Sequence, residues 1–75
     1  MQKHIVRAHI PYAALEPLAE GFFSAGDIET ASILLMFDAQ IVAVYDRQKD
    51  NYGVEVRLDT AEHSMTAQVV EMTKV

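Results

Sequence analysis

The sequence predicts a two-layer α+β protein, in the order β-α-α-β-β-β, whose small antiparallel sheet is covered by a helical hairpin. Two observations predict this class. Apolar and polar residues alternate near the N-terminus and again after residue 38, as in half-buried strands. Between these segments, apolar residues recur every three or four positions, as in helices. The 75 residues leave room for one core, so we expect residues 1–75 to form a single small domain.

The first element is a strand over His4–Ile10, because its side chains alternate in character with period two. One face carries Val6, Ala8 and Ile10, and the other carries Ile5, Arg7 and His9. The fixed φ of proline suits the first turn of a helix, so a helix begins at Pro11 or at Pro17. We expect a kink or a restart near Pro17.

Two helices follow. In the first, apolar side chains recur at spacings of three and four residues, at Leu15, Leu18, Ala19 and Phe22. Gly26 ends this helix because glycine readily adopts left-handed backbone, and Asp27 caps the next one. The second helix spans Ile28–Asp38, which is rich in Ala, Leu and Met. A buried strand over Ile33–Phe37 is the alternative for the same apolar run.

Residues 17–38, PLAEGFFSAGDIETASILLMFD, resemble the helix-turn-helix unit of tetratricopeptide repeats, in which a glycine-aspartate pair opens the second helix. The resemblance implies an antiparallel helical hairpin. A solenoid of such repeats needs about three stacked units, and this chain has a single copy. The resemblance therefore implies no function.

After Asp38 the pattern changes to period two. We expect a strand over Ile41–Asp46, a polar turn over Gln48–Asn51 and a second strand over Tyr52–Asp59. In the second strand, the inward side chains are Val54, Val56 and Leu58, and the outward ones are Glu55, Arg57 and Asp59.

The last segment has two interpretations. Its β-branched residues favour a closing strand over Met65–Thr73, which we choose. The alternative is a helix whose first turn is capped by Asp59 and Glu62. That helix would carry apolar residues at helical spacing, at Met65, Val69 and Met72.

The acidic residues are concentrated in one half of the chain. Between Arg7 and Arg47, 39 residues contain no lysine or arginine and have a formal charge of −6. The acids there are Glu16, Glu20, Asp27, Glu29, Asp38 and Asp46. The other 36 residues have a net charge of +1. Because the predicted second helix lacks side chains that read bases or bind phosphate, we expect no direct contact with nucleic acid.

No pattern predicts catalysis, a metal site or a cofactor, so we expect the protein not to be an enzyme. His4 and His9 fall on opposite faces of the first strand and cannot bind one metal ion together. His63 and Ser64 are adjacent, which does not create a hydrogen-bonded nucleophile and base. The glycines lack the spacing of a phosphate-binding loop, and the chain has no cysteine for a disulfide or a thiolate metal site.

Five consecutive apolar residues, Ile33–Phe37, surround the predicted second helix instead of forming one stripe. Either this helix is sandwiched within the fold or it belongs to an interface, for example that of a homodimer. No apolar stretch reaches the roughly 20 residues of a membrane-spanning helix, and the N-terminus has no signal-peptide pattern. We therefore expect a cytoplasmic protein that does not contact a membrane.

Together these features predict a small acidic protein without enzymatic activity that binds another protein as an accessory or inhibitor, of the kind that phages and other mobile elements encode. The expected partner has a basic surface. The expected binding residues are Glu16, Glu20, Asp27, Glu29, Ile33 and Phe37. Alternatives are a structural homodimer subunit with no inhibitory role, a nucleic-acid mimic, and a small enzyme or ligand carrier.

Overall fold

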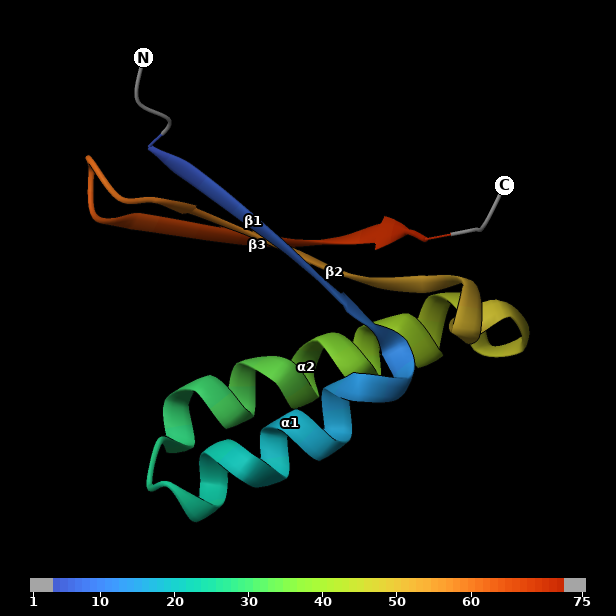
Figure 1. Cartoon of the computed structure of the whole chain (residues 1–75). Coiled ribbons are helices and arrows are strands. Elements are labelled where there is room, and N and C mark those ends of the chain that lie inside the picture. Colours follow the sequence, from blue (N-terminus) through green and yellow to red (C-terminus); the bar gives the residue numbers. More distant parts are fainter. Residues whose placement is uncertain (1–3, 73–75) are drawn as a thin grey trace.

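A computed structural model of the chain describes residues 4–72, in which one strand, a helical hairpin and a pair of strands follow one another (Figure 1). The elements are β1 (Ile5–Pro11), α1 (Tyr12–Ser24), α2 (Ile28–Tyr45), the 3₁₀ helix η1 (Asp46–Asn51), β2 (Tyr52–Asp59) and β3 (Ser64–Glu71). An antiparallel sheet and a helical hairpin are both present, so the expected α+β class is confirmed.

The sheet has β2 in the centre, with β1 and β3 antiparallel to it on either side. Ala8 lies opposite Val56, and Val56 lies opposite Ala67, so the predicted inward side chains share one apolar face. His9 and Glu55 share the opposite, polar face. The closing strand is confirmed over Ser64–Glu71, and its expected last residue, Thr73, lies outside the described residues.

The turn between β2 and β3 explains why a strand follows it and not a helix. The Asp59 carboxylate accepts hydrogen bonds from the backbone N–H groups of Ala61, at 3.0 Å, and Glu62, at 3.1 Å. These bonds fold the chain back on itself, as aspartate side chains commonly do in turns. His63 completes the turn with a φ of 56°, in the left-handed region. Asp59 therefore caps a hairpin turn.

The connection between α1 and α2 forms as the glycine-aspartate pair predicts. Gly26 has a φ of 86°, and its N–H donates to the carbonyl of Phe23 at 3.0 Å. The N–H of Asp27 donates to the carbonyl of Phe22 at 2.8 Å, which completes a Schellman motif. The Asp27 side chain accepts from the N–H of Thr30 at 3.1 Å and caps α2. The expected helical hairpin is confirmed (Figure 1).

Two expectations about the helices are wrong. The strand expected over Ile41–Asp46 is instead the last turn of α2 and the start of η1. Ile41 is fully buried two helical turns after Leu34, so packing along one helix face outweighs the β-branched composition. The alternative strand over Ile33–Phe37 is helical for the same reason. Of the kink or restart expected near Pro17, the restart is absent, because α1 is continuous through Pro17.

The buried core is small. It consists of Leu15, Ala19, Ala31, Leu34, Ile41 and Val54. Five of these residues belong to α1 and α2, and only Val54 belongs to the sheet. The fully buried part of the core therefore lies mainly between the two helices. Half-buried sheet residues pack against it, at Ile10, Tyr52, Val56, Ala67 and Val69.

Candidate functional site

An apolar cleft separates the sheet from the helical hairpin, which diverge from the end where β1 joins α1 (Figure 1). The cleft has a volume of about 260 Å³. Its lining comes from all three strands and both helices: Ala8, Ile10, Phe22, Thr30, Ile33, Leu34, Phe37, Val54, Val56, Met65 and Ala67. Thr30 is the one polar residue among them. The volume exceeds the roughly 150 Å³ that holds a benzene ring in a protein core, so large apolar side chains fit.

The helices cover the sheet at one end only. In the cross-strand row of Ile10, Val54 and Val69, Val54 is fully buried and its two neighbours are half-buried. In the row at the other end, Val6, Leu58 and Met65 are 55%, 40% and 62% exposed. We term this second row the sheet rim. It is an apolar surface that the rest of the described chain does not cover.

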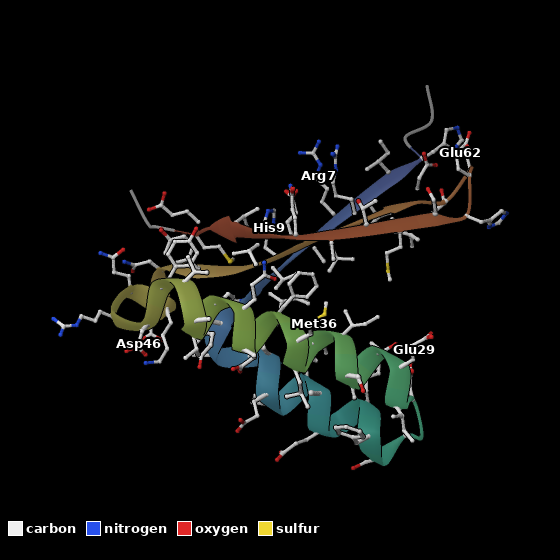
Figure 2. The ribbon with its side chains drawn as sticks, turned by 180° about the vertical axis from the view of Figure 1, so that it is seen from behind. Arg7, His9, Glu29, Met36, Asp46 and Glu62 are labelled. Carbon is white, nitrogen blue, oxygen red and sulfur yellow. The ribbon has the colours of Figure 1, made fainter. Side chains whose placement is uncertain are left out.

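Helix α2 carries exposed apolar side chains at the edge of the same cleft, and of these Ile33 is in its lining. Ile33 is 38% exposed and Met36 is 57% exposed, whereas Leu34 is buried and Phe37 is half-buried. Figure 2 shows Met36 beside the space between α2 and the sheet. We term Ile33 and Met36 the helix rim. As the sequence predicts, the fold buries some of this apolar run and leaves the rest exposed.

The predicted acidic binding residues all lie on the helical layer, but they do not form one cluster. Glu16 and Glu20 are exposed one turn apart on α1, and Glu29 is exposed in the first turn of α2 (Figure 2). Asp27 instead caps α2, and its hydrogen bonds from Thr30 lower the pKa of its carboxyl group. The carboxylate of Asp27 is thus engaged within the fold, while those of Glu16, Glu20 and Glu29 face solvent.

A shallow apolar groove runs along α1. It is lined by Ala14, Pro17, Leu18, Gly21, Phe22 and Ala25. Phe22 lines both this groove and the apolar cleft, so the two are continuous. No lysine or arginine occurs in α1 or α2. We term the groove together with Glu16, Glu20 and Glu29 the acidic helical surface.

Basic side chains lie on the polar face of the sheet. Arg7 is directly opposite Arg57 on the neighbouring strand, and Figure 2 shows Arg7 and His9 on the side away from the helices. His9 Nε2 is 3.1 Å from the Glu55 carboxylate, which also accepts a hydrogen bond from Gln68 at 3.3 Å. Sequence reasoning missed this arrangement, because the pairing of β1 with β2 joins residues about 50 positions apart. The polar face mixes both signs of charge.

Two tyrosines stack where η1 leads into β2. The rings of Tyr45 and Tyr52 have centroids 3.7 Å apart and planes inclined by 13°. Burial raises the pKa of Tyr52, with contributions from Glu71 and Tyr45. Burial also raises the pKa of Tyr12, as does the nearby Asp38 carboxylate. The phenols of Tyr12 and Tyr52 therefore stay protonated at neutral pH, which suits packing and not nucleophilic chemistry.

The described part of the chain, residues 4–72, holds no group of three or more histidine or carboxylate side chains that could bind a metal ion. His63 and Ser64 lie at the exposed end of the β2–β3 hairpin. Among the described residues, no hydrogen bond joins either side chain to a third group that would orient it for catalysis. The surfaces described above can bind apolar and charged groups.

Helix α2 with η1, residues 28–51, is long and apolar enough to cross a membrane by length and composition. In its most apolar window, 22% of the residues are buried inside the fold, and core helices of globular proteins meet the same criterion.

No protein-family model, curated protein or solved structure matches the chain. Function is therefore inferred from the surfaces themselves.

Proposed function

We propose that this chain is a small non-enzymatic protein that binds another protein, as an accessory or inhibitor, through the acidic helical surface. The observation that carries the proposal is the single sign of charge on the two helices. The helices contribute four carboxylates, Glu16, Glu20, Glu29 and Asp38, and no cation, whereas the strands carry both arginines and acids. A layer with one sign of charge attracts a partner of the opposite sign and raises the rate of encounter.

The apolar groove on α1 supports the same proposal. Charged groups at the rim of an interface act mainly on encounter, and apolar contacts at its centre give the complex its lifetime. The helical layer offers both, because Glu16 and Glu20 are exposed on α1 on a different side from the groove and Glu29 is exposed on α2. The expected partner is therefore a protein with basic groups around an apolar patch.

The test is affinity capture from a cell lysate with the immobilised chain, followed by measurement of the association rate with the captured protein. The triple variant Glu16→Gln, Glu20→Gln, Glu29→Gln should slow association and flatten its dependence on salt, since exposed charges are screened over about 8 Å at physiological ionic strength. Asp27 is left unchanged because it caps α2.

A matched control removes the same charge elsewhere. Asp46, Asp50 and Glu62 are exposed and lie in η1 and in the β2–β3 turn, and Figure 2 shows Asp46 and Glu62 at opposite ends of the molecule. Their change to Asn, Asn and Gln should leave the association rate nearer to that of the parent. Equal rates for both triple variants at low salt would show that only total charge matters and would refute the proposed surface.

A further inference from the structure

The isolated chain exposes more surface than a compact protein of its mass. Its accessible surface is 5681 Å², whereas a compact 8.4 kDa monomer exposes about 4,600 Å². Its Cα radius of gyration is 13.3 Å, against about 11.4 Å for a compact chain of 75 residues. The open cleft between the sheet and the hairpin contributes to both differences. The chain is thus an incompletely closed two-layer structure.

Exposed apolar residues adjoin the cleft on both sides. The sheet rim supplies Val6, Leu58 and Met65, and the helix rim supplies Ile33 and Met36. Of these, Met65 and Ile33 line the cleft itself. The buried core contains only four side chains larger than alanine. A domain with so small a core gains much of its stability from any partner that covers these rims.

We propose that the cleft is closed by a second copy of this chain. In this two-fold symmetric dimer, the sheet rim of each copy packs on the helix rim of the other. The excess surface of about 1,100 Å² is larger than the roughly 800 Å² that each partner buries in a stable interface, so an interface of ordinary size fits within it. A two-fold rotation repeats the contact, so both clefts close at once. The dimer contact uses the rims of the cleft, whereas the acidic helical surface uses the groove on α1, and Phe22 lines both the cleft and that groove.

Charge and shape favour a second copy over a membrane. None of the cleft's lining residues is charged, so the like charges of two copies stay outside the contact. A flat bilayer does not enter a concave space between two walls, and the net charge of −5 disfavours anionic lipid surfaces.

The first test is sedimentation equilibrium of the purified full chain at micromolar concentration. The wild type should show twice the chain mass of 8.4 kDa. Met65→Glu should raise the dissociation constant about a hundredfold or more, because each of the two contacts receives an unpaired charge. Ile28→Glu is the matched control, since Ile28 is as exposed as Met65, at 62%, but does not line the cleft. It should remain a dimer.

A second test remains informative if Met65→Glu fails to fold. The chain has no cysteine, so each single-cysteine variant carries one thiol. Met36→Cys and Met65→Cys chains of different tag length, mixed under mild oxidation, should form a mixed disulfide. Ile28→Cys with Met65→Cys should not. A monomer at all concentrations, a dimer that only Ile28→Glu dissociates, or binding of the monomer to neutral phospholipid vesicles would each overturn the proposal.

Discussion

Gly53 lies where the fold leaves no room for a side chain. It lies in β2 opposite Pro11, and a Cβ atom there would collide with the carbonyl oxygen of Ile10 and the side chain of Met72. Gly53→Ala should therefore lower the free energy of unfolding by about 1–3 kcal/mol, as overpacking does in general. Chemical denaturation measures the effect.

Gly21 provides the control for this substitution. It lies inside α1, and a Cβ atom there meets nothing within 4 Å. Gly21→Ala should raise the free energy of unfolding by roughly 0.5–1 kcal/mol, because alanine loses less conformational entropy in a helix. Equal stability of the two variants would show that β1 does not approach β2 closely at Gly53.

Asp27 makes the stability of the hairpin depend on pH. Hydrogen bonds from Thr30 lower the pKa of its folded carboxyl group. Its stabilising contribution is therefore present above the ordinary aspartate pKa of about 3.9, and it is lost as the pH falls through the lowered value. Asp27→Asn keeps a capping oxygen but does not titrate, so its melting temperature should fall less than that of the wild type on acidification.

Asp27→Ala removes the side-chain oxygen that caps α2, so it isolates the contribution of the cap. Asp27→Ala should melt below the wild type at neutral pH, and the gap should narrow at an acidic pH below the lowered pKa of the wild-type carboxyl group. Thermal melts followed by circular dichroism at both pH values measure this difference. A constant gap between the two proteins at both pH values would contradict a role for the charged carboxylate.

Among the elements, the parts predictable from sequence were those with strong local signals. The alternation in β1 and β2 and the Gly26–Asp27 pair each specify structure through neighbouring residues. The end of α2 was not predictable in this way, because Ile41–Tyr45 also reads as a strand. The helical signal in that region is a longer stripe at spacings of three and four, formed by Leu34, Phe37, Ile41 and Tyr45.

Ile41 tests the extended α2. It is fully buried against the core, so Ile41→Ala should destabilise the fold by about 2–5 kcal/mol. Val44 is in the same helix but 63% exposed, and Val44→Ala should change the stability by about 0.5 kcal/mol or less. A strand would also place Ile41 and Val44 on opposite faces, so the stability difference alone does not distinguish a helix from a strand. The helical circular dichroism signal of each variant must therefore be measured together with its stability. Comparable losses of stability for both variants would contradict the assigned packing.

For the complete chain, the apolar cleft was beyond sequence reasoning. Ile33 and Phe37 were identified as binding residues, and the structure places both in the lining. Their opposite wall comes from strands as far away as Ala8 and Met65. No local pattern specifies how far a sheet and a hairpin diverge, because that angle is set by contacts between residues distant in sequence.

If two copies close the cleft, the stability of the chain depends on its concentration. Association stabilises the folded state by mass action, so the melting temperature should rise as the protein concentration rises. The Met65→Glu variant should melt at a lower temperature that does not change with concentration. Differential scanning calorimetry over a hundredfold range of concentration measures both. A concentration-independent wild-type melting temperature would contradict the dimer.

The pairing of β1 with β2 also has a kinetic consequence. The α1–α2 hairpin and the β2–β3 hairpin each form from residues close in sequence, whereas pairing Ile5 with Asp59 closes a long loop. Loop closure carries an entropic cost that local hairpins avoid, so β1 should join last, after the transition state for folding. Substitutions in the two hairpin turns should then alter the rate of folding, while those in β1 should mainly accelerate unfolding.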